Sequence, residues 1–436
     1  MTAYDLAYGL AIVAAAPIWL LHPRFRPKML DALRERRGVV PHVDSKAPAI
    51  LIHAVSMGEI NATTALVKML AAARPDLRFI ITTTSRTGED RARQLYESNP
   101  RVTRLRFPFD FSRFVARMLD AQRPSAVALM ELEVWPNFMR ECRRRKIPVL
   151  LLNGRLSAHS FRGYRFAGAL TRGMFTRLTM ACVQDEVYAG RFEKVGVSAD
   201  RIRVTGTMKF DTAEIADAIS GADEIALAVG LHPGTEKIWV CGSTGPGEEQ
   251  IVLQAYRMLL EKFPALRLVV VPRHPQRFDE VAALIRDRGF SIVRRSQPNA
   301  PIAESNHPAV VLGDTMGELR KFYSLADVVF VGRTLIDLGP KQHGSDMIEP
   351  AALAKAIIVG PFTGNFADVM KGFRDGQGIV EVRDGSELYA AVERFLAFPA
   401  SAGEMGRKAQ DVVRQNQGAT SRHVGIILEH LPQVCG

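Results

Sequence analysis

The chain has 436 residues, of which 47% are hydrophobic and 24% are charged. These are ordinary values for a soluble globular protein, and they exclude disorder, collagen and coiled coil as the main architecture. A total of 57 Lys and Arg against 46 Asp and Glu gives a net charge of +11, which suits an acidic partner such as nucleic acid, an anionic membrane surface or a phosphorylated substrate.

The four cysteines stand singly along the chain, and no two of them form a Cys-x-x-Cys pair. They are Cys142, Cys182, Cys241 and Cys435. This spacing argues against a disulfide framework and against a zinc site, and it fits a reducing compartment.

The first apolar run, residues 6–21, reads LAYGLAIVAAAPIWLL and carries no charge. It is short for a membrane-spanning helix, which needs about 20 apolar residues. The basic stretch HPRFRPK follows it, and positive charge flanks the cytoplasmic end of membrane segments. We therefore expect residues 1–22 to anchor the protein, either spanning the membrane or lying in its interface, with the body on the cytoplasmic side. The alternative is a buried first helix of the first domain.

From residue 49 onward, short apolar runs alternate with helical segments, which predicts parallel sheets with right-handed crossovers. The expected fold class is therefore α/β, with two Rossmann-like domains and a ligand cleft between them. After the anchor we expect an N-terminal domain at 23–212, a linker at 213–235, a C-terminal domain at 236–402 and a helical tail at 403–436. The predicted strands are 49–55, 78–84, 125–130, 147–153, 178–184, 201–206, 238–244, 266–272, 309–314, 327–332, 356–361 and 378–382.

The positive charge is concentrated in the N-terminal half of the chain. Residues 140–177 contain ten basic side chains and one acidic side chain, whereas mixed signs are usual on soluble surfaces. The sequence contains no zinc-finger spacing and no RNA-recognition signature, and aromatic residues do not alternate with the bases. Nucleic acid is therefore an unsupported partner.

Polar side chains follow the predicted strands of the first domain. Glu59 comes at the start of a helix, where it either faces the cleft or only stabilises the first turn. Glu131 and Glu133 follow the strand at 125–130, and a turn between them is expected because like charges on one strand face repel each other. One would then face the cleft and the other would pair with the basic segment that follows; the alternative is two solvated loop acids. Lys209 closes the domain, where a solvated surface lysine is the simpler interpretation.

The second domain has three turns that follow predicted strands; two of them are rich in small residues and lead into a helix, and the third places Arg273 at the carboxyl end of its strand. They are Gly242–Glu249, the turn beginning at Arg273, and Gly313–Leu319. Helix N-termini favour phosphate, so several such turns suggest a nucleotide or sugar-phosphate site, although a capped helix explains any one of them. Asp346–Glu349 opens another helix, where a carboxylate could accept two ribose hydroxyls.

Several motifs occur in the order and spacing of one bacterial family. They are HAVSMGE, MELEVWPN, NGRLSAHSFRGY, TGTMKFD, STGPGEE, PRHPQRF, GDTMGEL and GPFTGNF. Together they resemble the 3-deoxy-D-manno-octulosonic acid (Kdo) transferases of lipid A assembly. The resemblance implies the GT-B glycosyltransferase fold, no metal and no cofactor, and CMP-Kdo as donor. It also implies a phosphorylated lipid A precursor (lipid IVA) as acceptor, in lipopolysaccharide biosynthesis at the cytoplasmic side of the bacterial inner membrane.

The resemblance also implies roles for individual residues. Glu59 matches the general base, and Glu131 and Lys209 match residues that stabilise the transition state. The reaction implied is a single inverting displacement, which resembles inverting glycoside hydrolysis with a sugar hydroxyl in place of water. The residues that match contacts to the CMP group are Pro272, Arg273, Met316, Gly317, Glu318, Asp346, Met347, Ile348 and Glu349.

One loop departs from the family pattern. Arg333 stands where the family has a glycine, Asp346 stands where Asn is usual, and the loop between them is slightly longer. Two alternatives stay open; the altered loop favours the first, and the presence of all the named acids and of Lys209 counts against the second. One is a related GT-B transferase that uses another activated sugar, and the other is a catalytically silent membrane-bound protein that binds a sugar nucleotide or a lipid.

Overall fold

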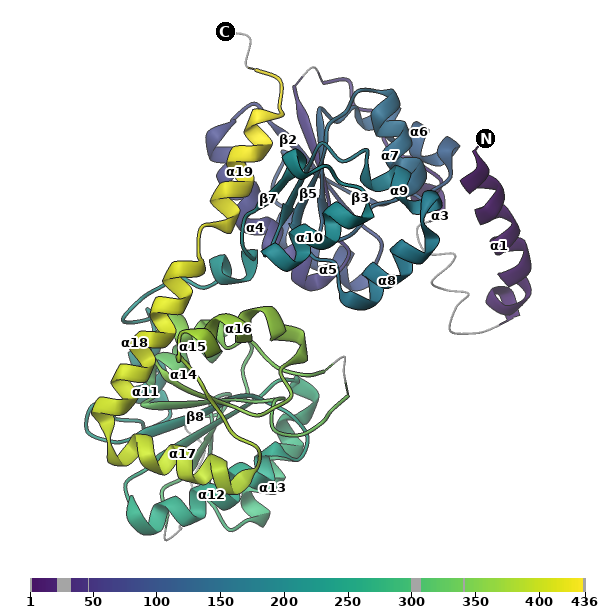
Figure 1. The fold of residues 1–436 in the computed structure, drawn as a ribbon. Coiled ribbons are helices and arrows are strands. Elements are labelled where there is room, and N and C mark those ends of the chain that lie inside the picture. The colour runs from purple at the N-terminus through teal and green to yellow at the C-terminus, as the bar shows by residue number, and fades with distance from the viewer. Residues whose placement is uncertain (1, 22–32, 46, 299–306, 340–341, 434–436) are drawn as a thin grey trace. The chain divides into compact units, whose positions relative to one another are not determined.

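The computed structural model describes residues 2–21, 33–45, 47–298, 307–339 and 342–433. The chain divides into two compact units. Unit 1 comprises Met1–Thr212 and Gln417–Gly436, and unit 2 comprises Ala213–Asn416. Each unit contains a seven-stranded sheet in which every strand pairing is parallel, so the α/β class is confirmed (Figure 1).

The sheet of unit 1 has the strand order β3-β2-β1-β4-β5-β6-β7. Its strands are β1 (Ala49–His53), β2 (Arg78–Thr83), β3 (Val102–Arg106), β4 (Ala126–Met130), β5 (Val149–Gly154), β6 (Met180–Val183) and β7 (Ile202–Val204). Alternate residues of one strand face two different cores, since Leu51 packs in one apolar cluster whereas Ile50 and Ile52 pack in another. Burial on both faces explains why the central strands are continuous apolar runs.

Helices cover both faces of this sheet, as Figure 1 shows. The C-terminal helix of the chain returns to unit 1 and packs against the helix that follows β1. The helices of unit 1 are α1 (Ala3–Leu21), α3 (Leu33–Arg36), α4 (Met57–Ala73), α5 (Arg86–Tyr96), α6 (Ser112–Gln122), α7 (Pro136–Arg144), α8 (Ala158–Ala167), α9 (Ala169–Phe175), α10 (Glu186–Val195) and α19 (Ala419–Glu429), with short 3₁₀ turns η1 (Ala199–Arg201) and η2 (Met208–Thr212).

The sheet of unit 2 has the order β10-β11-β9-β8-β12-β13-β14. Its strands are β8 (Ile238–Thr244), β9 (Arg267–Pro272), β10 (Ile292–Arg294), β11 (Val310–Leu312), β12 (Val328–Val331), β13 (Ala356–Val359) and β14 (Val380–Glu381). Its helices are α11 (Ala222–Ala228), α12 (Glu248–Lys262), α13 (Phe278–Asp287), α14 (Leu319–Leu325), α15 (Ile348–Ala352), α16 (Ala367–Asp375), α17 (Gly385–Ala397) and α18 (Pro399–Asn416), with 3₁₀ turns η3 (Pro275–Arg277) and η4 (Gly364–Phe366).

Two segments of the chain belong to units that differ from the domains predicted for them. Residues 213–235, expected to be a linker, lie within unit 2 and include α11. The tail expected at 403–436 is divided, because α18 belongs to unit 2 and α19 belongs to unit 1.

Polar contacts fix the first turn of α1 to unit 1. Asp5 is buried, and its carboxylate accepts hydrogen bonds from the backbone N–H of Ser112 at 2.8 Å and from Nδ2 of Asn137 at 3.1 Å. The Thr2 hydroxyl donates to Oδ1 of the same Asn137 at 2.7 Å. The start of α1 is therefore held against the first turns of α6 and α7.

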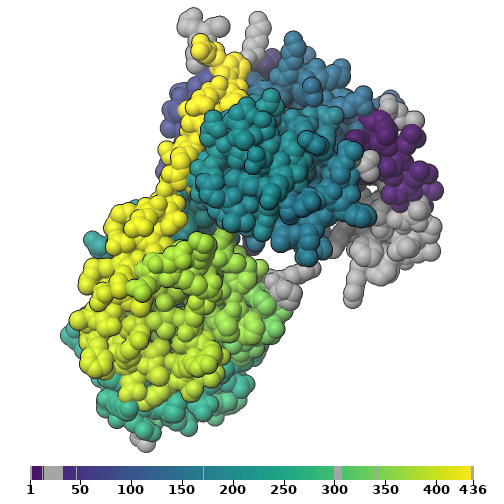
Figure 2. All heavy atoms as spheres, in the orientation of Figure 1, coloured from purple at the N-terminus to yellow at the C-terminus, as the bar shows by residue number. Residues whose placement is uncertain are grey.

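The side chains that follow this turn are apolar and exposed. Leu6, Leu10 and Val13 are 54%, 72% and 73% exposed, and Figure 2 shows the described part of α1 at the surface of unit 1. Among the described helices, none combines the length and the apolar character that a membrane crossing requires. The basic stretch at 22–28 lies outside the described residues. Anchoring by residues 1–22 stays a prediction.

Candidate active site

In both sheets the strand order reverses beside the first strand. β1 lies between β2 and β4, and β8 lies between β9 and β12. Successive connections leave such strands on opposite faces, and ligands of open parallel sheets bind there, beyond the carboxyl ends of the strands. We therefore expect the catalytic and ligand-binding residues in the segments that follow β1, β4, β8 and β12. The segments that follow these strands contain Glu59, in the first turn of α4, and Glu131, Gly245 and Arg333.

Glu59 lies in the first turn of α4 and forms a capping box with Ser56. The Glu59 backbone N–H donates to the Ser56 hydroxyl at 3.2 Å, and the Glu59 carboxylate accepts from the N–H groups of Val55 at 2.9 Å and Ser56 at 3.2 Å. Glu59 therefore stabilises the first turn of α4. Each carboxylate oxygen keeps a second lone pair, so a fixed carboxylate that can still accept a proton stands at the end of β1.

The turn expected between Glu131 and Glu133 is confirmed. Glu131 has a positive φ of 54°, and the Glu133 N–H donates to the Met130 carbonyl at 3.3 Å. Glu133 does not pair with the basic segment that follows, because its carboxylate accepts from Nε1 of Trp135 at 3.1 Å and lies 3.8 Å from Nε2 of His53. The turn thus aims Glu133 back toward the end of β1.

Three carboxylates interact electrostatically at this edge of the unit 1 sheet. Burial raises the pKa of Glu133, and the negative charges of Glu59 and Glu131 raise it further. Burial lowers the pKa of His53 to about 3, so the imidazole is neutral, and it stacks on Phe107 with ring centroids 3.8 Å apart. The sequence predicted that Glu133 either faces the cleft or pairs with the basic segment, and it gave no role to His53. Their proximity arises from the pairing of β1 with β4, which a single sequence does not display.

Lys209 lies half-buried in η2, and two contacts place this turn. Oδ1 of Asn153, a residue with φ of 53° at the end of β5, accepts a hydrogen bond from the Met208 N–H at 3.1 Å. The turn also packs against α4, whose first turn carries Glu59, and against α19. Lys209 therefore belongs to a segment that is anchored to the carboxyl edge of the same sheet.

The predicted donor residues of unit 2 follow neighbouring strands. Arg273 comes directly after β9 with an exposed side chain, and its N–H donates to the Thr244 carbonyl of β8 at 3.1 Å. Met316 is 70% exposed after β11, and Gly317 adopts a φ of 85° that a side chain would strain. Glu318 forms an ion pair with Arg295 at 3.0 Å. All four stand at the carboxyl edge of the second sheet.

The stretch from Asp346 to Glu349 opens α15, as expected. The Asp346 carboxylate accepts from the Ile348 N–H at 2.8 Å. Met347 and Ile348 have fully buried side chains, so they could contact a ligand only through their backbone. Burial and the nearby charge of Asp346 raise the pKa of Glu349 to about 7, and the positive charges of Arg320 and Arg273 act in the opposite direction. The structure thus brings Glu349 near Arg273.

The Gly-rich turn after β8 is covered by another loop rather than open to a phosphate. A Cβ on Gly245 would lie 2.7 Å from Cδ1 of Leu338, and one on Gly247 would lie 2.8 Å from Cδ1 of Ile336. These glycines are needed because residues 333–338 approach the turn closely. Of the two alternatives for this turn, the close packing favours a helix start over a phosphate site.

Glu248, the first residue of α12, holds the covering loop in place. Its side chain is fully buried, and burial raises its pKa, although backbone hydrogen bonds oppose the rise. The four N–H groups that donate to its two oxygens belong to Gly245 at 2.8 Å, Arg333 at 2.6 Å, Thr334 at 2.9 Å and Leu335 at 2.9 Å. No sequence signal separated this glutamate from an ordinary first-turn acid.

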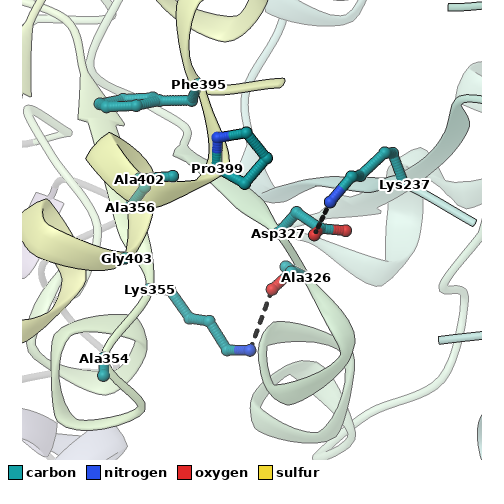
Figure 3. A pocket seen from close by; sticks show the side chains of 10 residues that line it. All are labelled: Lys237, Ala326, Asp327, Ala354, Lys355, Ala356, Phe395, Pro399, Ala402 and Gly403. Atoms are coloured by element: carbon teal, nitrogen blue, oxygen red, sulfur yellow. Dashed lines mark hydrogen bonds and ion pairs between the residues drawn. The ribbon is translucent and has the colours of Figure 1, made fainter. Parts of the chain in front are cut away.

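A pocket of about 170 Å³ lies at the opposite edge of the second sheet (Figure 3). Lys237, Asp327 and Lys355 line it, and they precede β8, β12 and β13. Lys237 pairs with Asp327 at 3.1 Å, while the Lys355 ammonium donates to the carbonyls of Ser324 at 2.8 Å and Ala326 at 2.9 Å, at the end of α14. These lysines are used structurally, and the pocket lies at the amino ends of the strands, so we do not assign the active site to it.

Comparison with known proteins decides the family. Residues 31–212 match the family described as 3-Deoxy-D-manno-octulosonic-acid transferase (kdotransferase). The 3-deoxy-D-manno-octulosonic acid transferase of Haemophilus influenzae is 32% identical over 411 residues, covering 94% of this chain and 92% of that protein. The chain belongs to the Kdo transferase family. The transferase of Bordetella pertussis is 31% identical and covers 87% of each chain. This Kdo transferase is therefore a glycosyltransferase of lipopolysaccharide biosynthesis.

Solved structures agree with the fold. A UDP-GlcNAc 2-epimerase from Neisseria meningitidis, bound to UDP-GlcNAc, covers 87% of this chain and all of its own, with a TM-score of 0.57 and 14% identity. A glycosyltransferase from Rickettsia africae has the same TM-score and identity and covers 88% of this chain and 99% of its own. At such identity the likeness concerns fold alone, and together with the two parallel sheets it confirms the GT-B architecture.

Proposed function

We propose that this Kdo transferase moves Kdo from CMP-Kdo to a phosphorylated lipid A precursor, lipid IVA, by a single inverting displacement. The observation that carries the proposal is the placement of Glu59 and Glu131 at the strand-order reversal of unit 1, where the family's chemistry requires acids. Arg273 at the carboxyl edge of the second sheet supports an anionic nucleotide donor there.

In the proposed reaction, Glu59 takes the proton of the acceptor hydroxyl as its oxygen attacks the anomeric carbon of Kdo. The bond from that carbon to the CMP phosphate breaks, and the sugar becomes oxocarbenium-like in the transition state. Arg273 stabilises the charge that develops on the departing phosphate. Glu131 and Lys209 stabilise the transition state, and no enzyme nucleophile is required.

Purified protein assayed with a panel of donors tests the proposal. The panel contains CMP-Kdo, other CMP sugars and UDP sugars, each with lipid IVA as acceptor. We expect transfer only from CMP-Kdo. Transfer from a different activated sugar would favour the related GT-B reaction, and binding of CMP-Kdo without transfer would favour a silent binding protein.

The proposed contact of Glu349 with the donor ribose gives a pH dependence. Below pH of about 7 the Glu349 carboxyl is protonated, and it becomes a carboxylate, the better acceptor for hydroxyl groups, as pH rises through that value. We therefore expect the KM for CMP-Kdo to fall as pH rises, by up to about tenfold per unit below pH 7. Glu349→Gln should flatten this profile. A KM that rises with pH in the unaltered enzyme would contradict the assignment.

The exposed side chains of α1 support contact with a membrane interface. Deleting residues 1–22 would also remove Thr2 and Asp5, which are buried against α6 and α7, so substitution is the cleaner test. We expect the triple change Leu6→Ser, Leu10→Ser and Val13→Ser to lower binding to anionic vesicles at least about tenfold, because burying each side chain in lipid contributes on the order of 1 kcal/mol or more. Co-sedimentation with vesicles measures the effect.

The matched control is Leu227→Ser, which alters an apolar side chain that is 79% exposed in unit 2. It should leave vesicle binding unchanged. Activity of the triple variant on detergent-dispersed acceptor should be kept. If the triple variant still sediments with vesicles at high salt, α1 is not the main anchor.

The basic segment at 140–177 supports binding of an anionic acceptor or membrane surface. Arg144 and Arg145 pair with Glu141, and Arg145 also pairs with Asp120, so they contribute less free charge than expected. The exposed bases suited to charge reversal are Arg140, Arg143, Arg162, Arg165 and Arg172.

Reversing these five charges to Glu should raise the KM for the acceptor and make activity less sensitive to salt. Each base near an anionic membrane surface contributes about 1 kcal/mol, and salt screens the effect. The KM for CMP-Kdo is the internal control and should hardly change. A change confined to the donor constant would refute the assignment of this surface to the acceptor.

A further inference from the structure

Arg333 has a backbone conformation that favours glycine. Its φ is 59°, in the left-handed region that costs a residue with a Cβ roughly 1 kcal/mol or more. The residue lies two positions after the end of β12, at the strand-order reversal of the second sheet. An arginine kept in a strained conformation at a ligand-binding edge indicates that its side chain has a function.

The surrounding structure holds Arg333 in this conformation from both sides. Its N–H donates to the buried Glu248 carboxylate at 2.6 Å, and its carbonyl accepts from the Gly344 N–H at 2.7 Å. Its side chain passes over the turn after β8, since a Cβ on Gly245 would lie 3.0 Å from Cγ of Arg333. The fixed backbone of Arg333 therefore directs its side chain over the turn after β8.

Arg333 has a positive neighbour, Arg273, and an anionic neighbour, Glu248, with which its guanidinium forms no ion pair. Among the residues that the structure describes, none forms an ion pair or hydrogen bond with this guanidinium, and its Nε is buried without a partner. Glu248 cannot serve, because its four acceptor positions are filled by backbone N–H groups. Burial lowers the pKa of Arg333, and the charge of Arg273 lowers it further. The same two arginines also lower the pKa of His274, for which burial is the largest cause.

We propose that Arg333 is a specificity-determining residue that binds an anionic group of the donor, beside Arg273. The inference rests on the proposed function, because it requires an anionic sugar nucleotide at this edge. Arg333 has no ion pair of its own, and its charge and that of Arg273 repel each other, so a ligand with two negative groups would stabilise both.

CMP-Kdo carries two such groups, the phosphate of the nucleotide and the carboxylate of the sugar acid. The guanidinium of Arg333 fits either group, because a planar fork of N–H donors matches phosphate and carboxylate alike. Arg273 then binds whichever of the two groups Arg333 does not bind. In both cases Arg333 favours a donor with an acidic sugar over a neutral one, and it does so with a residue that the family pattern lacks.

The variant that tests the inference is Arg333→Gly. Glycine relieves the left-handed backbone, so folding stability should be kept or improved. The KM for CMP-Kdo should rise about 10- to 100-fold, the usual loss for a hydrogen bond to a charged group, while the KM for the acceptor stays constant. Arg333→Lys keeps the charge but lacks the planar fork of donors. Its KM for CMP-Kdo should therefore lie between those of the unaltered enzyme and of Arg333→Gly.

A matched control is Arg123→Gly, because Arg123 is also an arginine with positive φ, 49°, and it lies exposed at the end of α6 in unit 1. It should leave the donor KM unchanged. Inhibition by CMP identifies the group that Arg333 binds. Weaker inhibition of Arg333→Gly by CMP assigns the phosphate, whereas unchanged inhibition with a raised KM for CMP-Kdo assigns the sugar carboxylate.

An unchanged donor KM in a folded Arg333→Gly enzyme would overturn the inference and leave the proposed function intact. Failure of the unaltered enzyme to use CMP-Kdo would instead remove the proposed function itself. Thermal unfolding of each variant, measured in parallel, separates a loss of donor contact from a loss of fold.

Discussion

Replacing Glu59 by glutamine is expected to lower kcat by about 10²- to 10⁴-fold, the usual loss when a general base is removed. Glutamine keeps the size of the side chain and one acceptor oxygen, but it cannot take the proton of the acceptor hydroxyl. Initial rates with CMP-Kdo and lipid IVA measure the loss. Binding of CMP should stay as in the unaltered enzyme, because Glu59 belongs to unit 1 and the predicted CMP contacts belong to unit 2.

The capping box complicates this test, because Glu59 also stabilises the start of α4. Ser56→Ala is the matched control: it removes the other side chain of the same box and should cost about 1 kcal/mol of folding stability. If Glu59 acts as the base, Ser56→Ala keeps most activity while Glu59→Gln loses it at similar stability. Near-normal turnover by Glu59→Gln, or equal losses in both variants, would leave Glu59 a helix cap only.

The sequence predicted the interior of both sheets better than their edges. Central strands such as β4 and β12 are buried on both faces and read as apolar runs, so their pattern is strong. Two strands were missed, β3 (Val102–Arg106) and β10 (Ile292–Arg294), and both are edge strands. Their partly exposed residues include arginines, and an edge strand needs only one neighbour and less apolar surface.

The site was predictable where the chemistry lies in a local motif and not where it depends on contacts between loops. The positions of Glu59 and Arg273 at the carboxyl ends of strands were predicted because each follows a strand or lies in the first turn of a helix. The contact of Glu133 with His53 and the role of Glu248 were not found, because they join segments 80 or more residues apart. No periodicity or spacing carries that information, since it arises only when parallel strands are placed side by side.

Replacing Glu248 by alanine is expected to disrupt the donor side of the enzyme. The change leaves the N–H groups of Gly245, Arg333, Thr334 and Leu335 without their acceptor. Each unsatisfied buried donor costs about 1–3 kcal/mol, and partial rehydration of the loop limits the sum to on the order of 3 kcal/mol. Thermal unfolding should show a clear destabilisation, and the KM for CMP-Kdo should rise at least about tenfold.

Glu248→Gln tells whether the charge or the shape of this residue matters. An amide offers one oxygen to four N–H groups, and its own NH₂ faces two of them, so Gln should be nearly as harmful as Ala. Glu261→Ala, at an exposed glutamate of the same helix, is the control for a lost carboxylate and should have little effect. If Glu248→Ala kept both its stability and its donor KM, the loop that carries Arg333 would not depend on this carboxylate. The left-handed backbone of Arg333 would then need another cause.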